Sequence, residues 1–222
     1  MKFGKLTVNQ TLITAPKAIS HSGILYTGDI PENVYITAGY FPVEDLPPPQ
    51  IDPRYQTVEW KYEVNKGIIK RTWKTRERNI DEVKEEKLTE INTACNQIIA
   101  AGVDVETSQG IEHFSLTAND QINIAFYEQQ ISAGASHIPY HADGKLCRMF
   151  AAAEITAVAT AAAQWKVYHT TYCNHLRDHI KGLDVAEDIA AVTYGMELPE
   201  ELKASFDAII AALGGAGDET PD

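Results

Sequence analysis

AGVDVETSQGIEHFSLTAND at residues 101–120 and AGASHIPYHADGKLCRMFAAAE at residues 133–154 decide the fold, because the same order of local signals occurs in both. Each stretch has a glycine that can end a helix, two β-prone runs around a glycine-containing turn, and a carboxylate that can cap the next helix. The turn glycine, Gly110 or Gly144, precedes this carboxylate by the same spacing in both stretches. The pattern predicts a repeated helix–hairpin–helix arrangement.

A short turn fixes the register of a hairpin, so the pairing within each stretch can be predicted. Gln109–Gly110 is the expected turn of the first hairpin, and Asp143–Gly144 is that of the second. In both cases one face of the hairpin is then apolar, and in the second hairpin Tyr140 faces Cys147. The opposite face of the second hairpin carries three polar side chains, those of His137, His141 and Arg148.

Length and composition set the class of protein. The chain has 222 residues, of which 44% are hydrophobic, and this is enough for a sizeable buried core. No stretch approaches the roughly 20 apolar residues of a membrane span, and MKFGKLTVNQ at residues 1–10 lacks the apolar block of a signal peptide. We therefore expect a soluble protein that is made in a cytoplasm and has no membrane partner.

Charge and cysteine content narrow the class further. A formal net charge of −12 opposes non-specific binding to the phosphates of nucleic acid. The three cysteines, Cys95, Cys147 and Cys173, are odd in number and widely spaced, which argues against a disulfide framework. We expect no nucleic-acid partner and free thiols.

The chain divides near residue 79, where the spacing of apolar residues changes. Residues 1–78 contain short β-prone runs broken by proline and glycine, with a stiff proline-rich linker at about residues 46–53. Residues 79–213 have helical periodicity, and residues 214–222 have the composition of a disordered tail. The predicted fold class is α+β, with a small antiparallel β region followed by a mainly helical domain that contains two β-hairpins.

Capping residues and apolar stripes locate the helices. They are expected at about residues 80–101, 117–133, 151–180, 184–194 and 199–213. Ile122 and Phe126 are expected to face the core, and Asp184 is expected to cap the helix that follows it. The longest helix carries a stripe of Ile155, Val158, Ala162, Trp165, His169, Tyr172 and Leu176.

Histidine and cysteine side chains gather between residues 137 and 179, where a zinc ion would need four such ligands in a tetrahedron. The candidates are His137, His141, Cys147, His169, Cys173, His175 and His179. No CxxC pair accompanies them, and the expected register separates Cys147 from His137 and His141. Buried thiols and a hydrogen-bonded core histidine are the simpler interpretation, so we expect no metal and no other cofactor.

The sequence contains no recognisable catalytic motif. No serine or cysteine lies in a recognisable nucleophile elbow, and no glycine-rich loop stands between a strand and a helix. In the β-prone runs at residues 57–75, Trp60, Tyr62 and Trp73 are candidates for an exposed recognition patch, although packing across a sheet is the commoner role of such side chains. We therefore expect that the protein is not an enzyme.

Several separated motifs resemble one family. AGVDVETSQGIEHFSLTANDQINI, ISAGASHIPYHADG, QWKVYHTTYCNHL and VTYGMELPEE follow one another between about Glu85 and Pro199. This part of the chain resembles an uncharacterised carboxy-terminal domain of bacteriophage and prophage proteins that are typically encoded among the tail genes. GYFPVEDLPPP, DPRYQ and a hairpin ending in RTW resemble passages of small baseplate and fibre-associated proteins. The family has no activity to carry over, so no residue inherits a catalytic role.

The resemblance implies a place in or beside a virion tail. It favours a non-enzymatic structural protein at the baseplate or at the attachment of a tail fibre, made in a bacterial host cytoplasm, with other tail proteins as partners. A chaperone for tail-fibre assembly is the alternative, and a metal-binding domain or metal-dependent enzyme is a third hypothesis. The rotational symmetry of tails is compatible with a symmetric homo-oligomer, although no heptad pattern sets its number.

Overall fold

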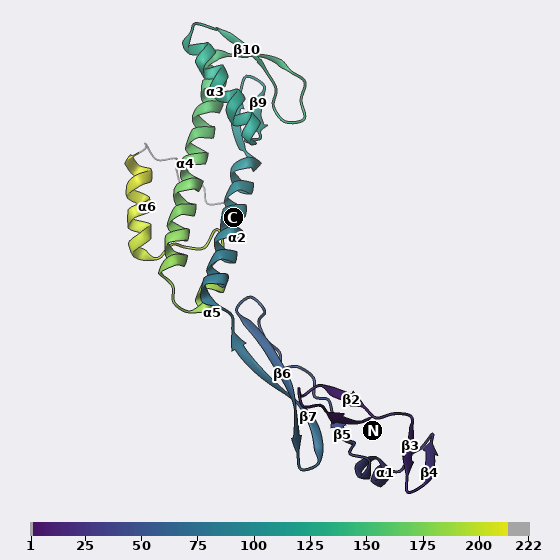
Figure 1. Ribbon diagram of the computed structural model, residues 1–222. Helices are drawn as coiled ribbons and strands as arrows, with labels where there is room; N and C mark the ends of the chain where they lie inside the picture. Colours follow the sequence, from purple (N-terminus) through teal and green to yellow (C-terminus); the bar gives the residue numbers. More distant parts are fainter. Residues whose placement is uncertain (1, 213–222) are drawn as a thin grey trace. The chain divides into compact units, whose positions relative to one another are not determined.

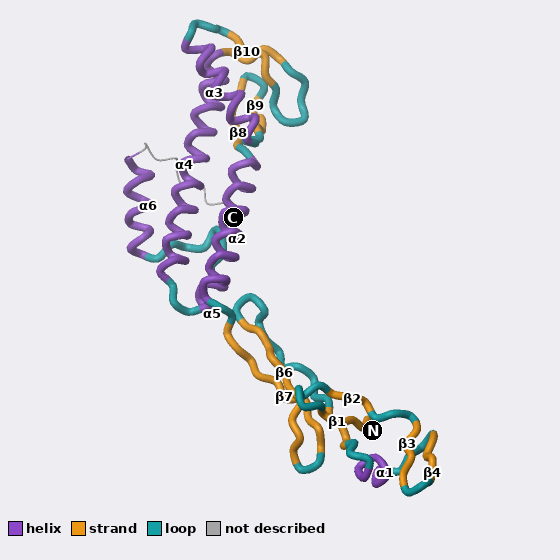
Figure 2. The backbone as a smooth tube through the Cα atoms, in the orientation of Figure 1, coloured by secondary structure: helices purple, strands orange, loops and turns teal. Residues whose placement is uncertain are grey.

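The computed structural model describes residues 2–212 (Figure 1, Figure 2). The chain forms two compact units, and the boundary between them lies between Asn79 and Ile80. Strands dominate the first unit, and the second consists mainly of helices with two short hairpins, so the predicted α+β class is confirmed. The tail predicted at residues 214–222 lies outside the described residues.

The first unit is built on one sheet with the strand order β2–β1–β5–β7–β6. Neighbouring strands in this sheet are antiparallel, except that β5 and β7 are parallel. A separate hairpin, β3–β4, and the short helix α1 belong to the same unit. The elements are β1 (Lys2–Leu6), β2 (Leu12–Thr14), β3 (Ala18–His21), β4 (Ile24–Thr27), α1 (Glu32–Thr37), β5 (Phe41–Glu44), β6 (Gln56–Asn65) and β7 (Ile68–Glu77).

β6 and β7 form a long hairpin with a two-residue turn. Lys66 and Gly67 at this turn have φ of 49° and 75°, and a type I′ turn requires such a pair of positive φ values. The register places Trp60 opposite Trp73. β6 is the outermost strand of the sheet, and within residues 2–212 it pairs only with β7.

The proline-rich segment predicted at residues 46–53 lies in the extended connection between β5 and β6. The start of this connection is fixed to β7. Arg71 forms an ion pair with Asp45 (Nε to Oδ1, 2.8 Å), and the indole of Trp73 donates a hydrogen bond to the carbonyl of Leu46 at 2.9 Å. The prolines therefore lie inside the first unit.

The second unit contains the predicted helix–hairpin–helix repeat. Its elements are α2 (Ile80–Ala101), β8 (Val103–Thr107), β9 (Gly110–Phe114), α3 (Ala118–Ser132), β10 (His137–Tyr140), β11 (Arg148–Ala151), α4 (Ala152–Gly182), α5 (Ala186–Ala191) and α6 (Glu200–Ala212). Thr117 and Asp120 form a capping box at the start of α3, and the side chain of Glu154 accepts a hydrogen bond from the amide of Ala151 at the start of α4.

α4 is the central helix of the second unit. It packs against α2, α3 and α6, and it also contacts β8, β10 and β11 (Figure 1). Its predicted apolar stripe is buried, with Trp165 only partly so. The core next to the hairpins combines both repeats and both helices: Val105, Phe114, Leu116, Ile124, Ile138, Tyr140, Phe150, Ile155 and Val158.

The hairpin turns differ from the prediction. In the first hairpin the turn is Ser108–Gln109, and Gly110 follows it with a φ of 96°, as in a type I turn followed by a glycine bulge. This shift of two positions leaves the same residues on each face. In the second hairpin the strands are offset by one residue, so Tyr140 lies opposite Arg148 and Cys147 is exposed.

A longer loop explains the offset of one residue in the second hairpin. Asp143 and Gly144 do form the centre of a turn, with the amide of Lys145 donating to the carbonyl of Ala142 at 3.1 Å. This turn sits inside a longer loop, because the strands stop at Tyr140 and restart only at Arg148. The two-residue loop on which the predicted register depends is therefore absent from this hairpin, and the faces of its second strand are exchanged.

Two further predictions were wrong. On α3 the buried residue is Ile124, whereas Ile122 and Phe126 are 66% and 54% exposed. The short apolar run around Ile124 fits two alternative stripes on a helix, and packing against α4 selects the one through Ile124. Asp184 does not cap α5, whose N-cap is Val185 and lacks a side-chain hydrogen bond.

Gly102 makes the closest backbone approach at the first hairpin. Its φ is 96°, and a β-carbon built on it would lie 2.1 Å from the carbonyl oxygen of Phe114 and 2.7 Å from the Cα of Ser115. Gly134, the equivalent residue before the second hairpin, has a φ of 102° but no atom within 4 Å of such a β-carbon. Only the first copy of the repeat therefore needs glycine for space as well as for conformation.

We predict that Gly102→Ala lowers the free energy of unfolding by about 2–5 kcal/mol, since the new methyl group meets backbone atoms that cannot move away. Gly134→Ala is the matched control, because it has the same backbone strain without the clash, and it is expected to cost about 1 kcal/mol. Urea unfolding at neutral pH measures both. Equal losses in the two variants would contradict the close approach at Gly102.

We also predict that residues 79–213 fold when expressed alone, because this segment contains its own buried core and its own helix caps. Circular dichroism and a cooperative melting transition check this. A molten fragment, together with a single transition for the whole chain, would contradict the division into two independently folding units.

Candidate functional site

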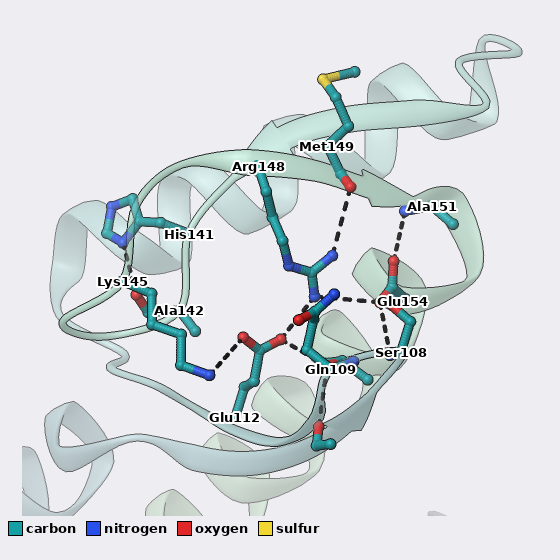
Figure 3. A network of polar contacts seen from close by, with 12 residues as sticks. Ser108, Gln109, Glu112, His141, Ala142, Lys145, Arg148, Met149, Ala151 and Glu154 are labelled. Carbon is teal, nitrogen blue, oxygen red and sulfur yellow. Dashed lines mark hydrogen bonds and ion pairs between the residues drawn. The ribbon is translucent and has the colours of Figure 1, made fainter.

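A network of charged and hydroxyl side chains joins the two hairpins to the start of α4 (Figure 3). Its members are Thr107 and Ser108 of the first hairpin, Glu112 on β9, Lys145 and Arg148 of the second hairpin, and Glu154 in the first turn of α4. Carboxylates with perturbed pKa values next to cations are common at functional sites, so this network is the candidate site.

Glu112 lies at the centre of the network and its side chain is only 1% exposed. One carboxylate oxygen accepts a hydrogen bond from Lys145 at 3.1 Å. The other accepts from Arg148 at 2.7 Å and from the hydroxyl of Thr107 at 2.6 Å. Both oxygens are thus satisfied, and both cations belong to the other hairpin.

Glu154 links Arg148 to the first turn of α4. Its Oε1 accepts hydrogen bonds from the backbone amide and the hydroxyl of Ser108, at 3.0 and 2.8 Å, and from Arg148 at 3.3 Å. Its Oε2 accepts from the amide of Ala151 at 2.7 Å. The negative charge therefore stands at the N-terminus of a helix, where the helix dipole favours it.

Arg148 bridges the two carboxylates, with the same terminal nitrogen contacting both. The carbon of its guanidinium lies 3.4 Å from the centre of the Phe150 ring, so the cation also rests on an aromatic face. Lys145 supplies the second positive charge. The network contains two carboxylates and two cations, and its charge is balanced.

Both carboxyl groups are strong acids in this setting. Burial raises the pKa of Glu112, but hydrogen bonds from Thr107, Arg148 and Lys145 outweigh it and bring the pKa to about 2. Hydrogen bonds from Ser108, the backbone amide first among them, lower the pKa of Glu154 to about 2. A general acid or base that works near neutral pH needs a pKa much closer to 7, so these groups act as fixed charges.

A second set of contacts fixes the loop of the second hairpin to the first. Asp143 accepts hydrogen bonds from the backbone amide (3.2 Å) and the hydroxyl of Ser115, and its own amide donates to the carbonyl of His113 at 2.9 Å. His113 contacts Asp104 (Nδ1 to Oδ1, 2.7 Å) and the carbonyl of Ala101 (Nε2 to O, 2.7 Å). The hydrogen bond with Asp104 makes the largest contribution to a raised pKa of His113.

The candidate metal ligands lie at separate places. His137 and His141 are exposed on the second hairpin. Cys147 is exposed in the loop before β11. The other four are on α4, where His169 and Cys173 are buried and His175 and His179 are partly exposed. Within residues 2–212, no group of three or more histidine, cysteine, aspartate or glutamate side chains is placed to hold a metal ion.

The buried members of this set have core partners. His169 contacts the hydroxyl of Tyr194 at 3.0 Å through Nδ1, and the thiol of Cys95 donates to the carbonyl of His169 at 3.4 Å. Burial lowers the pKa of His169 and raises that of Cys173 to about 11. These groups are therefore neutral at physiological pH and belong to the packing between α2 and α4.

In the first unit, the aromatic candidates surround one cation. The guanidinium of Arg71 lies 5.1 Å from the ring centre of Trp60, 5.4 Å from that of Tyr62 and 5.5 Å from that of Trp73. It also donates a hydrogen bond to the hydroxyl of Tyr62 at 2.8 Å. Tyr62 is buried, but Trp60 is 54% exposed, so the cluster has one open side.

The burial of Glu112 has a signal in the sequence. Glu112 and Phe114 alternate along β9, and Leu116 continues the spacing just after the strand, so the glutamate falls in register with two buried side chains. Its cations could not be assigned from the sequence, because Arg148 changes face with the register of the second hairpin.

A family model described as a domain of unknown function (DUF4376) matches residues 82–194, about half of the chain. The match begins in α2 and ends just after α5, and it includes both hairpins and the whole charge network. No curated protein and no solved structure matches the chain. Among the described residues, no helix is both long and apolar enough to cross a membrane.

We predict that stability falls steeply in acid. Because the folded pKa of Glu112 and Glu154 is about 2 and the ordinary value is 4.5, their contribution is fully present above about pH 4.5 and is lost as the pH falls towards 2. At about 1.4 kcal/mol per pKa unit, each carboxyl contributes on the order of 3 kcal/mol, with the two coupled through Arg148. Urea unfolding of residues 79–213 across this range measures the loss.

Glu112→Gln tests the same network by mutation. It leaves Arg148 and Lys145 without their buried partner and is expected to lower the free energy of unfolding by about 3–5 kcal/mol at neutral pH. Its stability should depend less on pH below 4.5 than that of the wild type. Glu106→Gln, on the exposed side of β8, is the control and should change little. A wild-type stability that is flat between pH 4.5 and 2 would contradict the network.

Proposed function

The chain belongs to the family defined by a domain of unknown function (DUF4376), and from the construction of this domain we propose that it is a rigid, non-enzymatic body of a bacteriophage or prophage tail protein. The protein acts through contacts with other tail proteins, at the baseplate or where a tail fibre attaches. Its location is the virion tail, after synthesis in the bacterial host.

The proposal that the protein is not an enzyme rests on the charge network between the hairpins. The close polar partners of Glu112 and Glu154 are members of the network and, for Glu154, the backbone amide of Ala151, and the low pKa values of both carboxyls keep them ionised. Such carboxylates stabilise an arrangement and do not transfer protons near neutral pH. The network joins β9, β11 and α4, so its effect is to make the two hairpins and the long helix one body.

The tail assignment is supported by the order of motifs between Glu85 and Pro199, which resembles a domain of phage and prophage proteins encoded among tail genes. The stretches that carry the resemblance include Thr107, Ser108 and Glu112 of the network, and Asp143 in the loop of the second hairpin. Part of what holds the hairpins together therefore lies within the stretches that carry the resemblance.

The first unit is the part that docks to another tail protein in this proposal. Its hairpin β3–β4 carries two adjacent exposed apolar residues, Ile24 and Leu25. A two-stranded hairpin is marginally stable in isolation, and contact with a partner stabilises it. Exposed apolar side chains on such an element fit a protein interface.

We predict that the protein is a stoichiometric component of tail particles. Quantitative mass spectrometry of particles purified from a strain that carries the gene should find the chain at a fixed ratio to the other tail proteins, and a salt wash should not remove it. Complementation of a deletion strain with Gly102→Ala should reduce particle yield, whereas Gly134→Ala should restore it.

Two outcomes would contradict this proposal. A chain that is abundant in the lysate and absent from finished particles would identify an assembly chaperone. Unchanged particle number and infectivity after deletion of the gene would remove the protein from tail construction altogether.

A further inference from the structure

The outer edge of β6 is open. This strand has ten residues, Gln56–Asn65, and in the described part of the chain it pairs only with β7. An edge of this length presents a row of backbone N–H and C=O groups with which another strand can pair. Natural edge strands are commonly short or protected by charges that point inward. β6 is long, and its charges, Glu59, Lys61 and Glu63, lie on one face and have both signs, so a copy of the strand can meet them with opposite charges.

The side chains of β6 are arranged so that the strand complements itself. On one face, Trp60 and Val64 are 54% and 53% exposed on either side of the buried Tyr62. On the other face, Lys61 and Glu63 carry opposite charges at neighbouring positions. An antiparallel copy of the strand can therefore meet both faces with partners of matching character.

We propose that a second copy of this chain pairs with β6 in antiparallel orientation, about a two-fold axis at Tyr62. Lys61 then lies opposite Glu63 of the second copy, and Trp60 lies opposite Val64 of the second copy. Each pair occurs twice, as a two-fold axis requires. The two sheets become one sheet that continues across the dimer. The inference concerns the first unit and does not depend on the tail assignment.

Charge and apolar contact together select this register over its neighbours. An axis at Lys61 places lysine against lysine and Glu59 against Glu63, which is unfavourable for pairs directly opposite each other. An axis at Trp60 places Glu59 against Lys61, which is also a favourable charge pair, but it leaves the exposed Val64 opposite the polar Gln56. Only the axis at Tyr62 covers both exposed apolar residues and matches both charges.

The test uses charge reversal in the full-length protein, with sedimentation equilibrium in low salt as the measurement. Lys61→Glu and Glu63→Lys each place like charges opposite each other twice, so each variant should dimerise about tenfold more weakly than the wild type. A mixture of the two variants should form a heterodimer of nearly wild-type affinity, because opposite charges then meet again. The double variant should also recover.

Separate controls test whether the variants still fold and whether the position of the charge on β6 matters. Lys61 and Glu63 are well exposed and their ion pair within one chain is worth little, so circular dichroism should show an unchanged fold. Lys74→Glu is the matched control: it makes the same charge change opposite Glu59 on β7, one strand in from the edge, and should leave dimerisation unchanged. Complementary variants that associate, with Lys74→Glu behaving as the wild type, support the pairing.

Four results would overturn the proposal. A wild type that stays monomeric at every concentration measured contradicts it. A mixture that associates no better than its components contradicts the register, as does rescue of Lys61→Glu by Glu59→Lys in place of Glu63→Lys. Equal weakening by Lys74→Glu would show that net charge, and not the edge of β6, controls association.

Discussion

Burying a carboxylate costs several kcal/mol unless its charge is paired and its oxygens accept hydrogen bonds. Glu112 meets this condition only when the second hairpin is in place, because Lys145 and Arg148 both come from that hairpin. Arg148 in turn reaches Glu154 at the start of α4. The position of each hairpin therefore depends on the other, and the long central helix is included in the same set of contacts. These hydrogen bonds are directional, so they fix the register of the hairpins above the apolar core that contains Phe114, Phe150 and Ile155.

The sequence predicted the parts of this domain that local chemistry decides. Thr117 with Asp120 is a capping signal that needs no tertiary information, and the apolar stripe of α4 is long enough to define its buried side. The repeat was visible because its glycines and carboxylates recur in order. Gly144 does have the positive φ that its place in a turn requires. Trp60 and Trp73 were also expected on one hairpin, and they lie opposite each other.

The errors arose where long-range contacts decide the outcome. Asp143 is attached to Ser115, far from it in the sequence, and this attachment holds a longer loop where a tight hairpin was predicted. The offset of one residue moved Cys147 to the surface and brought Arg148 towards Glu112. Ile122 and Phe126 were placed in the core because an apolar stripe does not say which of two faces meets α4. The charge network combines residues from both hairpins and α4, so it could not be assembled without the register.

The surroundings of His113 favour its protonated form. Both of its ring nitrogens have an oxygen acceptor at 2.7 Å, and only the imidazolium has a hydrogen on each nitrogen. The raised pKa means that this support is complete below the ordinary histidine value of 6.5 and is lost as the pH rises through the folded value. Unfolding in that interval releases a proton, which a comparison of unfolding heats in buffers of different ionisation enthalpy detects. A formal charge of −12, which counts histidine as neutral, therefore overstates the acidity of the folded protein wherever His113 keeps its proton.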